Sequence, residues 1–109
     1  MSTPEAAQPA KSDPPLIPLE TFLAALANPV RWRILRALSA GEPLPVMEIA
    51  RRVGRPDDTT SKHLVILKAA GLVKQGWGRL YRIEPAYQPV PGQPVLEFGH
   101  ALLRLDKGE

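Results

Sequence analysis

Apolar residues recur at helical spacing in four consecutive segments of the chain. In the first, about 16–27, leucines fall three or four residues apart beside Phe22, a period that indicates an amphipathic helix. The second is expected to run from Pro29 toward Gly41. Asn28 and Pro29 are typical of a helix start, because Asn caps the first turn and proline lacks an N–H that would stay unpaired there. The expected inward residues of this helix are Val30, Ile34, Leu35 and Leu38.

The third and fourth segments lie close together. A short helix is predicted over about 46–53, after Pro43 and Pro45 and before Gly54, since glycine is a common helix terminator. The fourth helix is predicted over about 57–70. Its first two residues are aspartates, which are favourable at the positive end of the helix dipole.

The pattern then changes. Two short strands are expected at about 72–75 and 79–84, joined by Gly76-Trp77-Gly78, whose glycines tolerate positive φ. A final apolar stripe of Val95, Phe98, Leu102 and Leu105 predicts a terminal helix over about 95–107. Residues 1–15 lack apolar periodicity and predict a flexible tail, and the proline-rich stretch 85–94 predicts a partly extended connector. Residues 16–109 are thus expected to form one mainly α domain of about five helices and a two-stranded hairpin.

This order of elements is that of a winged helix-turn-helix, in which a short helix braces a second one that presents small polar residues. Thr and Ser reach base edges or phosphates without filling the groove, and Lys meets a phosphate. A basic hairpin suits the flanking backbone or minor groove. The candidate DNA-binding residues are Arg55, Asp58, Thr59, Thr60, Ser61, Lys62 and His63 at the fourth helix, and Lys74, Gln75, Trp77 and Arg79 on the hairpin.

Several of these residues have a second interpretation. Asp58 either stabilises the first turn of its helix, which we favour, or accepts a hydrogen bond from a cytosine amino group. For His63 we favour a structural or phosphate-contact role over that of a pH switch or ligand. Arg51, Arg52 and Arg55 either contact phosphates or form a solvated helix face.

Three segments in order resemble ArsR/SmtB-type repressors. They are LANPVRWRIL at 26–35, TSKHL at 60–64 followed by AGLV at 70–73, and GRLYR at 78–82. The resemblance covers about 16–84 and implies a homodimeric, cytoplasmic transcription regulator whose first and last helices form the dimer interface. On this chain the implied interface residues are Leu16, Leu19, Phe22, Leu23, Phe98, Leu102 and Leu105. In that family an effector usually weakens operator binding.

The chain departs from the family at its sensor sites. It contains no Cys, which excludes thiolate metal sites, disulfides and cysteine nucleophiles, and Leu-Pro-Val-Met-Glu at 44–48 stands where many relatives place a Cys-x-Cys pair. Glu97 and His100, three residues apart on the expected last helix, would supply only two of the roughly four ligands that zinc needs. We therefore predict no metal and no cofactor. A small organic molecule, an interacting protein or no effector at all would each fit.

Charge and composition complete the picture. The 109 residues allow one small domain, no apolar run approaches the roughly 20 residues that span a bilayer, and the start is unlike a signal peptide, so we expect an intracellular protein. The net charge of +3 is the sum of +7 on residues 31–82 and −4 on the rest of the chain. The basic charge therefore lies on the segment expected to bind DNA. No catalytic constellation is apparent. We predict a homodimeric, sequence-specific DNA-binding repressor; the alternative is a winged-helix protein-interaction module without an operator.

Overall fold

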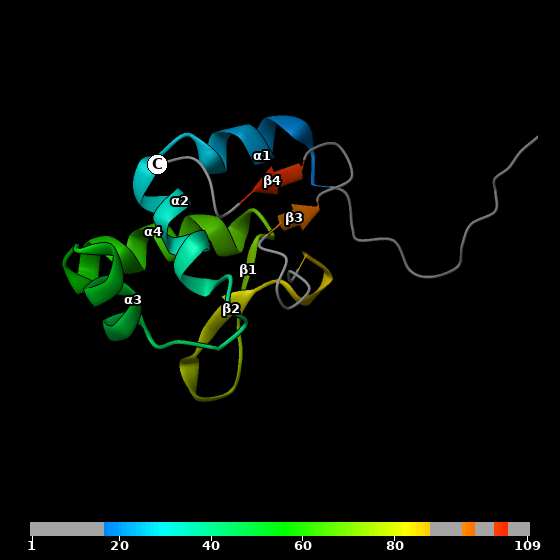
Figure 1. The fold of residues 1–109 in the computed structure, drawn as a ribbon. Coiled ribbons are helices and arrows are strands. Elements are labelled where there is room, and N and C mark those ends of the chain that lie inside the picture. The colour runs from blue at the N-terminus through cyan, green and yellow to red at the C-terminus, as the bar shows by residue number, and fades with distance from the viewer. Residues whose placement is uncertain (1–16, 88–94, 98–101, 105–109) are drawn as a thin grey trace, which may run out of the picture.

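The computed structural model describes residues 17–87, 95–97 and 102–104. Within them, four α-helices lead into a β-hairpin, and two further strands pair with each other (Figure 1). The helices are α1 (Leu19–Leu26), α2 (Pro29–Leu38), α3 (Val46–Val53) and α4 (Asp57–Ala69). The strands are β1 (Val73–Gln75) with β2 (Tyr81–Ile83), and β3 (Val95–Glu97) with β4 (Leu102–Arg104), both pairs antiparallel. Short 3₁₀ turns are η2 (Trp77–Arg79) and η3 (Pro85–Tyr87).

The local signals at the helix ends act as predicted. The Asn28 side chain accepts a hydrogen bond from the Val30 N–H at 2.8 Å, and Pro29 occupies the first turn of α2. Gly54 ends α3 in the left-handed conformation, with φ of 72°, and its N–H donates to the Ala50 carbonyl at 2.9 Å. Such a cap favours glycine because a Cβ is disfavoured there. The predictions of α2, α3 and α4 are therefore confirmed.

One hydrophobic core joins the helices to the hairpin. Its fully buried members include Ile34, Leu35 and Leu38 of α2, Ile49 of α3, Leu64 and Leu67 of α4, and Ile83 of β2. Because α3 and α4 both pack against α2, one face of α4 is fixed in the core while the other faces outward. The mainly helical fold with a two-stranded wing is the predicted winged helix-turn-helix.

Helix α1 is shorter than predicted and uses a different face for the core. Phe22 and Ala25 are its buried residues, whereas Leu19 and Leu23 are 52% and 56% exposed. Phe22 is only 3% exposed, so the expectation that it lies in a dimer interface is wrong: its side chain already fills the core of its own chain. Leu16 lies outside the described residues.

The prediction of a terminal helix is wrong. Strands β3 and β4 occupy its place, with Val95 opposite Arg104 and Glu97 opposite Leu102. Gly99 lies in the middle of the predicted helix and disfavours it by about 1 kcal/mol relative to alanine, and a short apolar run fits either a helix or a strand. The proposed placement of Glu97 and His100 on one helical face therefore fails. Phe98, His100 and Leu105 lie outside the described residues, and Leu102 is described in its backbone only.

The wing differs from prediction in two details. Leu44 forms a bridge with Tyr81, its N–H donating to the Tyr81 carbonyl at 2.9 Å and its carbonyl accepting at 2.8 Å. Leu44 precedes Pro45, and a residue before proline is held extended. Leu44 can therefore pair with Tyr81 on the outer edge of β2. At the tip, Gly78 has a positive φ (70°), as expected of a turn glycine, whereas Gly76 does not, and Arg79 also adopts a positive φ (61°).

Candidate nucleic-acid interface

The N-terminal half of α4 presents polar side chains to the surface. The helix begins where the Thr60 N–H donates to the Pro56 carbonyl at 2.9 Å, after a turn in which the Arg55 N–H donates to the Ala50 carbonyl at 3.1 Å. The following predicted residues are all at least partly exposed: Arg55, Asp58, Thr59, Ser61, Lys62 and His63. Since the opposite face of α4 is packed against α2 and α3, these side chains have a fixed direction relative to the core.

Thr60 is the exception among the predicted helix residues. It is fully buried, and its Oγ1 has no hydrogen-bond partner within the described part of the chain. Thr60 precedes Leu64 and Leu67 by four and seven residues, so all three lie on the core face of α4. The expectation that Thr60 contacts DNA is therefore wrong. Its helical spacing from Leu64 and Leu67 is the sequence signal that predicts its burial.

Asp58 stabilises the start of α4. Its Oδ1 accepts a hydrogen bond from the Thr59 N–H at 2.8 Å, and the N-cap position is occupied by Pro56, which offers no side-chain cap. One of the unpaired N–H groups at the helix start is thereby satisfied. This contact supports the interpretation of Asp58 that we favoured.

Two arginines of α3 share one carboxylate of the same helix as their ion-pair partner. Arg52 donates to Glu48 at 2.7 Å, and Arg51 forms a bidentate pair with the same carboxylate. Hydrogen bonds from Arg51 and then Arg52 lower the pKa of Glu48 to about 2. Sequence reasoning overlooked Glu48, although carboxylate-to-arginine spacings of three and four residues are those that meet on a helix surface.

Arg31 joins three helices. Its Nε donates to the Ala25 carbonyl at 2.6 Å and its Nη2 to the Ala24 carbonyl at 3.3 Å, while its Nη1 lies 3.1 Å from Nδ1 of His63. The pKa of His63 is lowered by burial and by the nearby charges of Arg31 and Arg55. No local sequence signal predicts the contact between Arg31 and His63, because the two residues lie 32 positions apart in the chain.

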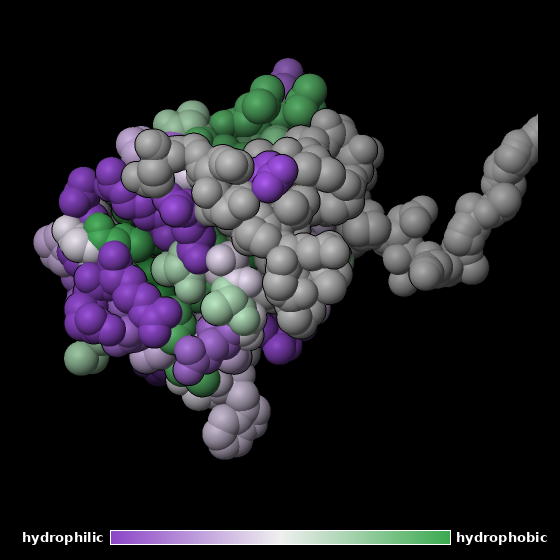
Figure 2. Space-filling model, viewed as in Figure 1, coloured by the Kyte–Doolittle hydropathy of each residue, from purple (hydrophilic) through white to green (hydrophobic). Residues whose placement is uncertain are grey.

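The wing supplies a second polar surface. Trp77 is 95% exposed, and Lys74 and Arg79 are also exposed, while Gln75 accepts from Lys68 of α4 at 3.4 Å. Figure 2 shows the wing tip projecting from the body and polar residues gathered over the side formed by α3 and α4, with apolar residues over the outer face of α1. Apart from Thr60, the predicted helix and wing residues are thus at least partly exposed, and the hydrogen bond from Lys68 to Gln75 links the C-terminal end of α4 to the wing.

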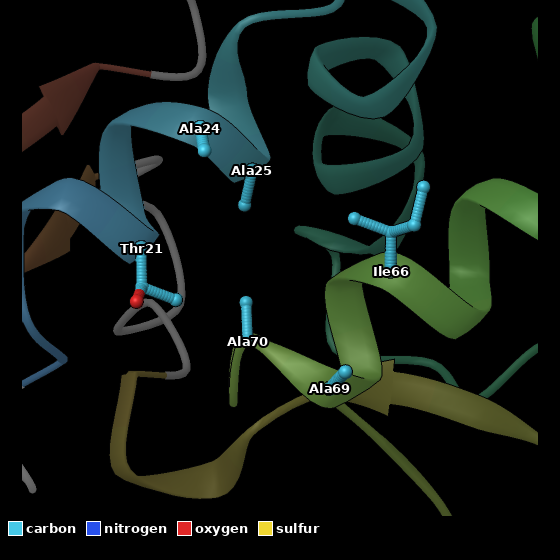
Figure 3. A pocket seen from close by; sticks show the side chains of 6 residues that line it. All are labelled: Thr21, Ala24, Ala25, Ile66, Ala69 and Ala70. Atoms are coloured by element: carbon cyan, nitrogen blue, oxygen red, sulfur yellow. The ribbon is translucent and has the colours of Figure 1, made fainter.

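A groove separates α1 from the end of α4 (Figure 3). Its volume is about 370 Å³, and its lining residues are Thr21, Ala24, Ala25, Ile66, Ala69 and Ala70. The side chains point into it from both helices, and Thr21 provides the polar atom in an otherwise aliphatic lining. The volume lies at the lower end of the range for small-molecule sites.

In the described part of the chain, no group of three His, Cys, Asp or Glu side chains is arranged to hold a metal ion. None of the helices in that part has the length and apolar character needed to cross a membrane.

Comparison with known proteins agrees with this geometry. Residues 26–76 match a family model described as a helix-turn-helix domain, while no curated protein matches the chain. Among solved structures, HlyU from Vibrio cholerae is similar, with 29% sequence identity and a TM-score of 0.53 over 60% of this chain and 73% of that one. The described residues thus form a winged helix-turn-helix, and these two matches support a DNA-binding transcription regulator.

Proposed function

We propose that this chain is a homodimeric, sequence-specific DNA-binding repressor. In this proposal the exposed N-terminal half of α4 enters the major groove and the wing follows the flanking backbone or minor groove. The observation that carries it is that the N-terminal half of α4 exposes polar side chains while Leu64 and Leu67 hold the helix in the core, and that the wing projects from the same body. The proposed contact residues are Arg55, Asp58, Thr59, Ser61, Lys62, His63, Lys74, Gln75, Trp77 and Arg79.

Dimerisation and the place of action belong to the same proposal. Leu19 and Leu23 expose apolar surface on α1, and a two-fold dimer would place two α4 helices in successive major grooves of a near-palindromic site. We expect such a regulator to act in the cytoplasm. An effector, where one acts, is expected to be a small organic molecule or a protein, since the cysteines of the family's thiolate site are absent.

Selection of duplexes from a random-sequence library, followed by mobility-shift titration, tests the proposal. We expect a near-palindromic duplex to be enriched. Lys62→Ala should weaken binding to that duplex and should lower the number of counterions released on binding by about one. Arg33→Ala is the matched control, because Arg33 is an exposed cation on α2, outside the proposed contact residues. Failure to enrich any duplex at low salt, together with a monomeric mass, would refute the proposal.

The second candidate is a protein-interaction module without its own operator. The nearly complete exposure of Trp77 favours it, since exposed aromatic side chains are common anchors of protein interfaces. This candidate predicts that Ser61, Lys62 and Arg79 can be replaced by alanine without loss of function. A loss of DNA binding accompanied by a loss of regulation in those variants would exclude it.

A further inference from the structure

Arg31 connects the C-terminal end of α1 to the outer side of α4. Helix C-termini leave carbonyl groups unpaired, and a cation there is favoured by the helix dipole. Arg31 extends from α2 and donates to the Ala25 carbonyl and to the Ala24 carbonyl, which also accepts from the Ala27 N–H at 3.3 Å. Its remaining nitrogen lies 3.1 Å from Nδ1 of His63. A single guanidinium therefore fixes α1, α2 and the proposed DNA-binding helix relative to one another.

The contact with His63 requires one protonation state. A guanidinium has donors only, so Nδ1 of His63 must accept, and the imidazole must be neutral with its proton on Nε2. A second proton on the ring removes the acceptor and sets two cations 3.1 Å apart. The charged groups that act on His63 in the described part of the chain are Arg31 from α2 and Arg55 from the turn before α4, and both are cationic.

We propose that Arg31 is a positioning residue for DNA recognition: it ties α4 to α1 through neutral His63, and protonation of His63 releases that tie and lowers sequence discrimination below neutral pH. The inference rests on the proposed function, because α4 is the helix assigned to the major groove. It keeps the structural role that we favoured for His63 and adds the pH sensitivity that we had ranked below it.

The direction of the pH effect separates this role from a direct phosphate contact. If His63 met a phosphate as a cation, acid would strengthen binding to every duplex, and DNA would raise the pKa of His63. If neutral His63 holds α4 in place, acid weakens the discrimination between the correct duplex and others. A phosphate contact therefore leaves the ratio of specific to non-specific affinity unchanged in acid, whereas the positioning role lowers that ratio.

The first experiment uses the free protein and no DNA. Nitrogen-15 NMR of the imidazoles across about pH 5 to 8 should show His63 as the Nε2–H tautomer with a pKa below its ordinary value of 6.5. Arg31→Met should move that pKa toward 6.5 because it removes both the charge and the donors, whereas Arg31→Lys keeps a cation near the ring and should move the pKa less. Arg33→Met, an exposed neighbour on α2, is the control and should leave it unchanged. An Nδ1–H tautomer, or a pKa indifferent to both Arg31 variants, would overturn the inference.

The second experiment measures affinity for a duplex enriched at about pH 8 and for a scrambled duplex of equal composition. Loss of a charge-assisted hydrogen bond predicts a roughly tenfold fall in the affinity ratio between about pH 8 and pH 5. His63→Asn keeps an acceptor near Nδ1 but does not titrate, so its ratio should not vary with pH, whereas His100→Asn, the chain's other histidine, should retain the fall. A constant or rising wild-type ratio would disprove the positioning role.

If no duplex is enriched, the proposed function fails, and with it the role of Arg31 in DNA recognition. The imidazole titration still decides whether Arg31 holds His63 neutral.

Discussion

At the scale of single residues, Glu48 controls how much positive charge α3 can offer to DNA. Arg51 and Arg52 both pair with its carboxylate, and that carboxylate stays ionised because the two arginines hold its pKa at about 2. A phosphate approaching α3 must compete with Glu48 for these guanidinium groups. The internal pair therefore limits binding that depends on charge alone.

Glu48→Gln should increase affinity for non-specific DNA and steepen its salt dependence by about one or two counterions. Stability should change by less than about 1 kcal/mol, because exposed ion pairs contribute little. Binding to a random-sequence duplex at several salt concentrations measures the effect. Glu42→Gln is the control, since Glu42 is exposed and lies before α3. Equal salt slopes for both variants would show that α3 does not approach the phosphates.

Thr60→Val distinguishes the buried position from a DNA contact. The hydroxyl of Thr60 is buried without a described partner, so an apolar side chain of the same shape should leave stability unchanged or raise it by about 1 kcal/mol. DNA affinity should stay as in the wild type, whereas Ser61→Ala should reduce it. Urea unfolding and mobility-shift titration measure the two quantities. A folded Thr60→Val variant with weakened DNA binding would contradict the assignment.

At the scale of elements, local signals were sufficient where the sequence carries caps and stops. In the structure, α2 begins after Asn28 and α3 ends before Gly54, as the sequence predicts. The terminal segment has apolar residues at helical spacing but no comparable start signal beyond Pro94, and Gly99 interrupts it. Pairing of β3 with β4 supplies cross-strand partners that the pattern of one segment does not encode. The contact between Arg31 and His63 was hidden for the same reason, because it depends on how helices pack.

Asn28→Ala tests the cap that starts α2. Removing the side-chain acceptor leaves the Val30 N–H without its 2.8 Å partner and should destabilise the fold by about 1 kcal/mol. The urea midpoint should fall with little change in the slope of the transition. Asn28→Asp keeps a capping oxygen and should lie within about 0.5 kcal/mol of the wild type. Equal losses in both variants would mean that the side chain matters for another reason.

At the scale of the whole molecule, the exposed leucines of α1 are the contact surface that the proposed dimer would use. Leu19 and Leu23 are each more than half exposed, and burial of a leucine side chain contributes roughly 1.5–3 kcal/mol. A symmetric contact would bury both residues from each chain, so two charged substitutions should be enough to prevent it. Because Arg31 ties α1 to α4, the same association would also fix the spacing of the two proposed DNA-binding helices.

The wild-type chain should therefore sediment at about twice its 11.9 kDa mass, whereas Leu19→Glu combined with Leu23→Glu should sediment as a monomer with an unchanged circular dichroism spectrum. Met47→Glu is the matched control, since Met47 is 71% exposed on α3, and it should remain dimeric. Monomers hold one recognition helix each, so the double variant should lose affinity for a palindromic duplex much more than for a single half-site. A dimer that persists in the double variant would move the interface away from α1, and a wild-type monomer would remove the two-fold arrangement from the proposed function.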